Sequence, residues 1–317
     1  MRRARLFLLV TSLVAAGYAA CDPYEEDVRE PADDAGIEVV DAVAKPDVER
    51  PASDAGSDAE SDAWIPCAMR ALDPAHFCDD FDFQGAIPSK WTNTIAISGA
   101  IFDELNAHSP PRAFGARLIA DAGPPTRAQL IRNRPTEIDL TTKSKLRLSF
   151  NLRVRGDPFA TGTDNGRYLH IALLDFDDAL CLTTPGSKTR SIEVSFVASN
   201  PANPLRIAVK GMRELCLPDA GGPQDIQTAP AVDIGYFRTA YRRVVLEVKR
   251  DATCKGGPSF PGSVFLQVDD LPGTCLPVAD PFSHGQALKL LLGAYAGGAQ
   301  PSGAFEASYD NVTFDIE

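Results

Sequence analysis

Apolar and polar residues alternate one by one along several stretches of the chain. The clearest stretch runs from Lys145 to Arg155, where five apolar side chains fall on one side and charged or small polar side chains fall on the other. A period of two is that of a β-strand with one buried face. The same period recurs over 192–196, 205–209, 244–248 and 264–268. Further strands are expected near 91–103, 113–119, 127–133, 167–176, 287–296 and 305–316.

Turn-forming residues separate these stretches. Glycine and proline cluster at Gly123-Pro-Pro, Asn200-Pro, Gly256-Gly-Pro and Leu271-Pro-Gly. No comparable stretch repeats its apolar residues with the period of a helix. Ten or more strands at this spacing, without helices between them, predict an all-β domain built as a two-sheet antiparallel β-sandwich over residues 64–317.

The first 20 residues follow a different pattern. Three arginines among the first five residues precede an apolar run that ends near Val14, and two alanines stand just before Cys21. This is the layout of a signal peptide, so we expect residues 1–20 to be removed on export. The apolar run falls short of the ~20 residues that cross a bilayer, which argues against a transmembrane anchor.

Cleavage before Cys21 resembles the bacterial lipoprotein pattern, in which that cysteine carries the lipid. Tyr18 departs from the pattern, because the family usually has leucine there. The resemblance implies an exported protein that is anchored by lipid to the cell envelope or cell surface. Cleavage as an ordinary secretory peptide would instead leave Cys21 as a free thiol.

The cysteine count agrees with a separate role for Cys21. Of seven cysteines it is the only one in the first 66 residues. The other six fall as near neighbours and predict disulfides in an oxidising compartment, although six cysteines allow 15 pairings. These neighbours are Cys67 with Cys78, Cys181 with Cys216, and Cys254 with Cys275. No C-x-x-C pair or cysteine-histidine spacing typical of zinc is present.

The acidity of the chain belongs to residues 21–63. Residues 22–63 carry 15 acidic and 3 basic side chains, a composition typical of a disordered tether. Residues 64–317 carry 28 acidic and 25 basic side chains, net −3. A nearly neutral domain argues against a nucleic-acid partner.

Short motifs at both ends of the domain resemble the concanavalin A-like, laminin-G-like jelly roll. Asp79-Asp-Phe-Asp-Phe followed by Trp91 opens the domain, and Tyr309-Asp-Asn-Val-Thr-Phe closes it. In that superfamily the entrance strand pairs near the terminal strand. The resemblance implies a curved sandwich with one concave sheet face, where many relatives bind or cleave sugars. A fold alone does not establish such a function.

Asp310 is predicted to point inward, because strict alternation places it on the side of Val312, Phe314 and Ile316. Some members of the superfamily hold a structural calcium ion between the two chain ends. By that resemblance Asp79, Asp80 or Asp82 would supply hard oxygen ligands together with Asp310. The alternative is a carboxylate that accepts hydrogen bonds from backbone amides at a strand end. No catalytic cofactor is expected.

The motifs of two kinds of sandwich enzyme occur only in part in this sequence. The E-x-D-x-x-E pattern of retaining glucanases occurs only at 25–30, inside the tether. The acids on the strands, Glu193, Glu247, Asp269 and Glu306, are scattered and are interpreted as solvated. Sandwich-fold polysaccharide lyases resemble the chain at Tyr168-Leu-His170, but their R-x-E-x-R and Q-I-H strands are missing. A half-buried structural histidine is the alternative interpretation of His170.

Proteins usually bind sugars against the rings of exposed aromatic side chains. The candidates are Trp91, Tyr168, Tyr236, Tyr241 and Tyr295. Trp91 also fits a core position. The arginines at 147, 153, 155, 242, 243 and 250 are interpreted as solvated strand faces, unless they converge on one sheet. The sequence therefore favours a lipoprotein whose domain binds a glycan or another envelope partner without catalysis, with a polysaccharide lyase or glycoside hydrolase as the alternative.

Overall fold

A computed structural model gives the structure of the part of the chain that lies within Ser61–Glu317. The residues it describes are 67, 73–82, 90–120, 125–159, 167–176, 187–198, 204–215, 224–228, 232–254, 262–279, 282, 288–296, 301 and 303–317. No helix among them is long and apolar enough to span a membrane. The signal peptide, Cys21 and the acidic tether lie outside the described residues.

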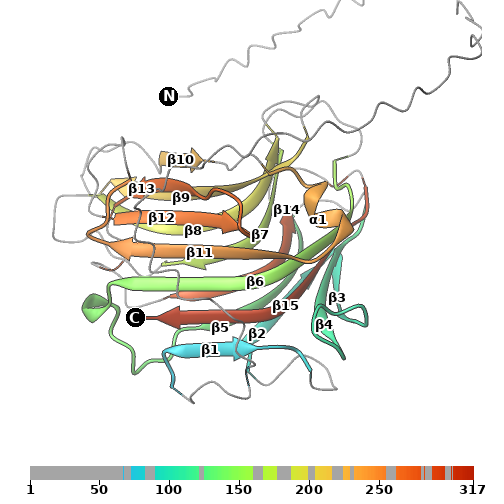
Figure 1. Ribbon diagram of the computed structural model, residues 1–317, viewed down its shortest axis with the longest axis horizontal. Coiled ribbons are helices and arrows are strands. Elements are labelled where there is room, and N and C mark those ends of the chain that lie inside the picture. Colours follow the sequence, from blue (N-terminus) through green and yellow to red (C-terminus); the bar gives the residue numbers. More distant parts are fainter. Residues whose placement is uncertain are drawn as a thin grey trace, which may run out of the picture. The chain divides into compact units, whose positions relative to one another are not determined.

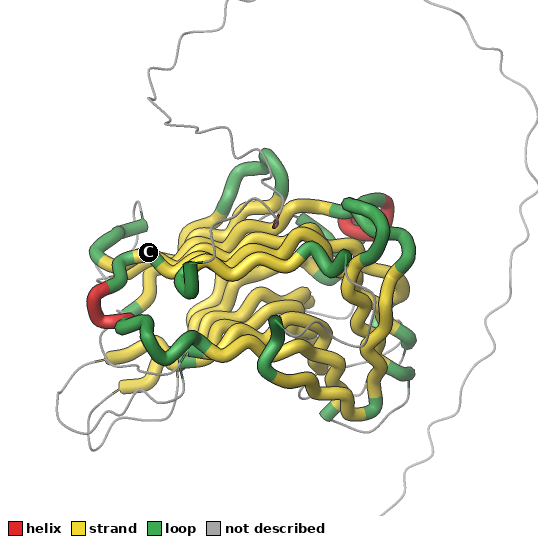
Figure 2. Tube along the Cα trace, turned by 90° about the horizontal axis from the view of Figure 1, so that it is seen from below, coloured by secondary structure: helices red, strands yellow, loops and turns green. Residues whose placement is uncertain are grey.

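The described strands form two antiparallel sheets that stack as two layers (Figures 1 and 2). Sheet A has the order β13-β12-β11-β6-β15-β4-β3, with β1 also paired to β15. Sheet B has the order β10-β9-β8-β7-β14-β5-β2. Long crossings between the sheets place strands that are distant in sequence side by side, as in a jelly roll. The predicted all-β sandwich is confirmed.

The bounds of the strands follow the predicted stretches closely. In sheet A they are β1 (His76–Asp79), β3 (Gly99–Glu104), β4 (Ala113–Leu118), β6 (Lys145–Gly156), β11 (Arg242–Arg250), β12 (Gly262–Val268), β13 (Thr274–Val278) and β15 (Phe305–Ile316). In sheet B they are β2 (Asn93–Ile97), β5 (Thr126–Asn133), β7 (Arg167–Asp175), β8 (Ser187–Ala198), β9 (Arg206–Leu215), β10 (Gln224–Thr228) and β14 (Lys289–Ala296). A single helical turn, α1 (Tyr236–Thr239), precedes β11.

The core lies between the two sheets and is built from the alternating residues. In β6, the apolar side chains from Leu146 to Val154 are at most 1% exposed, while Arg155 at the end of the strand is exposed. Tyr309 of β15 is fully buried, and its hydroxyl donates to the backbone oxygen of Ile171 in the opposite sheet at 3.0 Å. Each fully buried large side chain stabilises the fold by roughly 1.5–3 kcal/mol.

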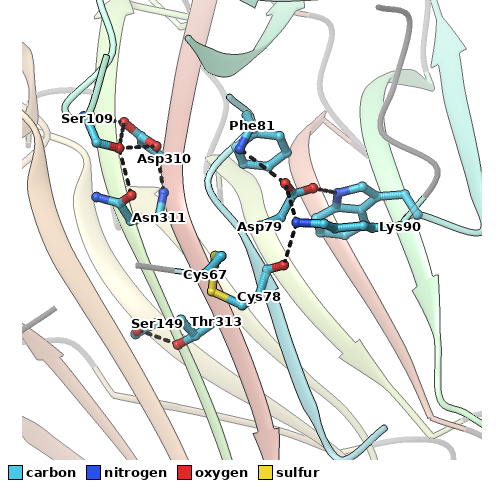
Figure 3. The surroundings of a disulfide bond; sticks show 11 residues. Cys67, Cys78, Asp79, Phe81, Lys90, Ser109, Ser149, Asp310, Asn311 and Thr313 are labelled. Atoms are coloured by element: carbon cyan, nitrogen blue, oxygen red, sulfur yellow. Dashed lines mark hydrogen bonds and ion pairs between the residues drawn. A yellow bond between two sulfur atoms is a disulfide. The ribbon is translucent and has the colours of Figure 1, made fainter. Parts of the chain in front are cut away.

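The two ends of the domain meet as the resemblance predicted. Strand β1 pairs with β15, with Asp79 opposite Val312. A disulfide joins Cys67 to Cys78, beside Asp79 (Figure 3). The predicted pair Cys254–Cys275 is also present. The third predicted pair, Cys181 with Cys216, lies outside the described residues.

The side chain of Asp79 is fully buried beside this disulfide and is held by three donors. Its Oδ2 accepts from the indole nitrogen of Trp91 at 2.8 Å, and its Oδ1 accepts from the backbone nitrogen of Phe81 at 3.1 Å. The ammonium group of Lys90 lies 3.5 Å from Oδ1 (Figure 3). Trp91 is only 6% exposed and packs against Phe77 and Phe81. Its core interpretation is confirmed, so its ring offers no platform for a sugar.

Strict alternation fails in β15, and the predicted inward direction of Asp310 is wrong. The register against β6 shifts between Asp310 and Thr313, and Asn311 has a left-handed φ of 52°. This bulge inserts an extra residue, so Asp310 lies on the same face as Ser308, while Val312 and Phe314 still face the core. Asp310 is nevertheless fully buried, because the segment before β4 covers it.

Candidate functional site

Four polar side chains form a row across the outer face of sheet B. Arg127 of β5 is opposite Tyr295 of β14, Tyr295 is opposite His170 of β7, and His170 is opposite Ser195 of β8. We call these four residues the central row. Their strand neighbours Ala128, Ala294, Leu169, Val194 and Phe196 are buried between the sheets, so the central row faces away from the core.

Two bulges bring Tyr295 and His170 opposite each other. In β14 the register shifts between Leu292 and Tyr295, and Gly293 in this interval has a φ of 136°. A Cβ atom on Gly293 would lie 2.2 Å from the backbone oxygen of Ala128, which only glycine avoids. In β7 the extra residue falls between His170 and Ala172. Bulges of this kind commonly redirect side chains near functional sites.

Three side chains of the central row, those of Arg127, Tyr295 and His170, stack as planar groups. The guanidinium carbon of Arg127 lies 4.2 Å from the centre of the Tyr295 ring. The rings of Tyr295 and His170 are nearly parallel, with an interplanar angle of 20° and centroids 5.2 Å apart. The cation above the tyrosine ring is attracted by its π electrons. Tyr295 and Arg127 are half-buried, whereas His170 is 6% exposed. Tyr295 therefore occupies the middle of the stack.

The buried carboxylate of Glu193 fixes the orientation of the His170 ring. Its Nδ1 lies 3.0 Å from Ser195 Oγ and 3.1 Å from Glu193 Oε2. Burial by itself would raise the pKa of Glu193, but the hydrogen bond and the charge of His170 outweigh burial and lower that pKa. An ionised Glu193 favours the imidazole tautomer with its proton on Nδ1. The interpretation of Glu193 as solvated was wrong, because it is 7% exposed.

Two buried donors on this face have no hydrogen-bond acceptor among the described residues. They are Arg127 Nε and Gln129 Nε2. Both residues belong to β5 and point to the same face, because they are two positions apart. Gln129 is only 1% exposed. A buried donor without an acceptor costs roughly 1–3 kcal/mol, so an acceptor that reached these atoms would bind favourably.

The predicted lyase pair is only partly brought together. His170 is in the central row, but the side chain of Tyr168 lies outside the described residues. The tyrosine that contacts His170 is Tyr295, which the sequence suggested only as a sugar platform. The sequence missed Arg127, Gln129 and Ser195 altogether. The available signal was the alternation of Arg127 with Gln129 on a strand whose intervening residues are apolar.

The remaining aromatic candidates lie elsewhere. The hydroxyl of Tyr236 on α1 donates to Asp269 at 2.9 Å, and the guanidinium of Arg242 covers its ring at 3.8 Å. Tyr241 lies over the outer face of sheet A, where Arg153 is 4.8 Å from its ring centre. The predicted aromatics whose side chains the structure describes thus do not form a single platform.

The arginines singled out in the sequence all belong to sheet A and do not converge on the central row. Arg153 and Arg155 lie 3.7 and 3.3 Å from the buried carboxylate of Glu104. Arg147 pairs with Glu247 at 3.6 Å. Basic and acidic side chains therefore offset each other on that face.

The acids proposed as calcium ligands are divided between two places. Asp310 accepts from Ser109, whereas Asp79 is held by Trp91 and Lys90 (Figure 3). The pKa of Asp82 is raised, mainly because burial disfavours the charged carboxylate. The negative charges of Asp80 and Asp79 also raise it. In the part of the chain that is described, no group of three His, Cys, Asp or Glu side chains could hold a metal ion. Calcium stays a prediction, which melting with and without a chelator tests.

Asp310 makes the free energy of unfolding depend on pH. Burial raises the pKa of its carboxyl from 3.8 to about 6, against the opposing hydrogen bonds from Ser109 and Asn311. The folded state therefore binds the proton more tightly, and the stability that Asp310 contributes falls as pH rises from about 4 to about 6. Relative to Asp310→Asn, the wild type should lose on the order of 3 kcal/mol across this window in chemical denaturation. A difference that stays constant with pH would contradict this.

No protein-family model and no curated protein matches the chain. Among solved structures, the chain is similar to an endo-β-1,4-glucuronan lyase from the fungus Trichoderma reesei, with a TM-score of 0.50 and 15% identity over 76% of this chain and 95% of that chain. An alginate lyase from a Chlorella virus matches with a TM-score of 0.44 and 10% identity over 72% and 93% of the two chains. The binding domain of botulinum neurotoxin serotype C1 matches with a TM-score of 0.40 and 10% identity over 69% and 43%. At 15% identity the likeness to the glucuronan lyase shows the fold alone, a jelly-roll β-sandwich.

Proposed function

We propose that the domain binds an acidic polysaccharide along the outer face of sheet B, with a sugar carboxylate held by Arg127 and Gln129. The observation that carries the proposal is the pair of buried donors, Arg127 Nε and Gln129 Nε2, which have no acceptor among the described residues. A carboxylate can accept hydrogen bonds at both oxygens and can pair with a guanidinium, so it satisfies both donors at once.

The neighbours of these donors suit a sugar ring. The half-buried side chain of Tyr295 stands beside Arg127 and presents its edge and hydroxyl to a ligand, because Arg127 and His170 cover the two faces of its ring. On the other side of Tyr295 lies the imidazole of His170, whose Nε2 is an acceptor when the ring proton is on Nδ1. A uronic acid residue needs an anion partner together with partners for its hydroxyl groups. The glucuronan lyase with the same fold makes glucuronan the first polymer to try.

A second candidate function is cleavage of the same polymer by β-elimination. One observation favours this reaction: the buried Glu193 orients His170, and the ring of His170 stacks on Tyr295, which carries a hydroxyl. In this reaction a base removes the proton next to the carboxylate carbon. The electron pair forms a C=C bond, the glycosidic C–O bond breaks, and the departing oxygen takes up a proton. His170 and Tyr295 are the side chains placed to accept and donate these protons.

A polysaccharide panel tests the proposal. Purified protein is assayed with glucuronan, alginate and polygalacturonate, and with neutral glucans and galactans as controls. Binding is followed by affinity electrophoresis, and product release by the ultraviolet absorbance of the unsaturated sugar. We expect acidic polymers to retard the protein more strongly than neutral ones, with binding of the acidic polymers that weakens as salt rises. Equal retardation by neutral polymers, or none by any polymer, would contradict the proposal.

The same assay separates binding from catalysis. If product forms, His170→Ala should lower turnover by at least about 100-fold while leaving retardation by the polymer in place. His76→Ala is the matched control, because the Nδ1 of His76 also lies 3.0 Å from a carboxylate, that of Asp315, but on the edge strand β1. Equal turnover in His170→Ala and the wild type would exclude His170 from the reaction.

We also propose that the protein is held at the cell envelope by a lipid on Cys21. The support is the signal-peptide pattern of residues 1–20 and the isolation of Cys21 from the other cysteines. We expect the wild type expressed in a bacterial host to enter the detergent phase on partitioning and Cys21→Ser to stay in the aqueous phase. Aqueous partitioning of both proteins would reject the anchor.

A further inference from the structure

A pocket of about 370 Å³ opens on the outer face of sheet A, on the opposite side of the sandwich from the central row. We call it the sheet A pocket. Its size is near the lower end of the range for small-molecule sites. The residues whose side chains matter for its chemistry are His108, Ser109, Asn151, Tyr241, Arg243 and Asn311.

The bulge of β15 forms one wall of the sheet A pocket. Asp310 sends its carboxylate beneath the segment before β4, where it accepts from the backbone nitrogen of Ser109 at 2.7 Å and from its hydroxyl at 3.1 Å (Figure 3). The same hydroxyl lies 2.8 Å from Asn311 Oδ1. Asp310 also accepts from the backbone nitrogen of Asn311 at 2.8 Å. A buried carboxylate thus fastens this wall to the sheet.

The opposite wall is fastened in a similar way. Asp269, in the turn after β12, accepts from the backbone nitrogen of Arg243 at 2.7 Å and from the hydroxyl of Tyr236 at 2.9 Å. The ring centroids of Tyr241 and His108 lie 5.8 Å apart, so the contact between these two side chains connects the two walls. Because both walls are held by hydrogen bonds to the sheet, the shape of the pocket is set before any ligand arrives, which lowers the entropic cost of binding.

The lining is polar and carries charges of both signs. Arg243 and Asp269 both contribute to it, and the Asp269 carboxylate lies 3.5 Å from the guanidinium of Arg242. The amide of Asn151 and the Nδ2 group of Asn311 supply hydrogen-bonding groups, whereas the hydroxyls of Ser109 and Ser149 already bond to Asp310 and Thr313. Tyr241 and His108 add aromatic surface. A hydroxyl-rich, uncharged ring matches this set, whereas an anion would meet Asp269 and the buried Asp310.

We infer that the sheet A pocket binds a single neutral sugar residue, at the end of a chain or as a side branch. The inference is independent of the proposed function, because it concerns the other sheet and an uncharged ligand. A domain with an acidic-polymer face and a neutral-sugar pocket on opposite sides would hold two glycans at once.

The test uses neutral monosaccharides and saturation-transfer NMR on the full mature chain. Glucose, galactose, mannose, rhamnose and N-acetylglucosamine are compared, with dissociation constants from titration. We expect at least one to bind, and Asn151→Leu to weaken it by at least about tenfold, because leucine fills the pocket and removes the amide. Asn311→Gly is the second variant; glycine keeps the left-handed φ of 52° and removes the side chain.

Arg127→Ala is the control in this experiment, and it should leave the monosaccharide affinity unchanged. Binding of a neutral sugar that is lost in both pocket variants and kept in Arg127→Ala supports the inference, whatever the outcome of the acidic-polymer panel. The inference is overturned if none of the five sugars binds, or if both folded pocket variants bind as the wild type does.

Discussion

Gly293→Ala is expected to lower the free energy of unfolding by at least about 3 kcal/mol and to remove the affinity for acidic polysaccharide. The φ of 136° at this position is open to glycine and strained for alanine. The new Cβ atom would lie 2.2 Å from the backbone oxygen of Ala128 on β5, so the two strands must separate. Tyr295, two residues on, would then leave its place between Arg127 and His170.

Gly211→Ala is the matched control for this prediction. Gly211 lies in β9 of the same sheet, and a Cβ atom there would meet only side-chain carbons, the nearest being Val278 at 3.3 Å. We expect it to cost less than about 1 kcal/mol. Urea denaturation of both variants gives the comparison. Equal stability of Gly293→Ala and the wild type would show that the bulge does not require glycine.

Trp91→Phe is expected to destabilise the domain by about 2–4 kcal/mol at neutral pH, because it leaves a buried carboxylate oxygen without its donor. The indole nitrogen of Trp91 donates to Asp79 Oδ2 at 2.8 Å, and Asp79 is fully buried. Phenylalanine keeps most of the contact with Phe77 and Phe81. The remaining loss is therefore mainly that of the hydrogen bond.

The pH dependence separates this cause from a loss of packing. Burial raises the pKa of Asp79, and the interactions with Lys90, Phe81 and Trp91 oppose that rise. Without Trp91 the pKa should rise further, so the carboxyl takes up a proton more readily as pH falls. The destabilisation measured by denaturation should then be smaller at about pH 4 than at pH 7. The same loss at both values would point to packing alone.

The sequence predicted the strands well because most of them bury one face and alternate without interruption. Strand β6 is the clearest example, with every second residue in the core. Strand β10 (Gln224–Thr228) has no apolar alternation, and β13 (Thr274–Val278) is a short edge strand that contains a proline, so neither was predicted. Edge strands carry weak patterns because fewer of their residues are buried on folding.

The candidate site could be predicted only in part, since it depends on bulges. A prediction from alternation assumes that every second residue points to the same face of the sheet. One inserted residue reverses the predicted face of every residue that follows it. For this reason the sequence misplaced Asp310, and it did not anticipate Tyr295 and His170 as cross-strand partners. Glu193 was wrongly interpreted as solvated for another reason: a carboxylate on a polar strand face usually is solvated, and its burial depends on partners from other strands.

The most direct test of the proposed function is the dissociation constant for an acidic polysaccharide in Arg127→Ala. The matched control is Arg117→Ala, because the guanidinium of Arg117 also lies over an aromatic ring, that of Phe102 at 5.1 Å, but on sheet A. We predict that Arg127→Ala weakens binding by at least about tenfold, as loss of a charge-assisted hydrogen bond requires, and that Arg117→Ala binds as the wild type does. Equal affinity of wild type and folded Arg127→Ala for every acidic polymer would contradict the account.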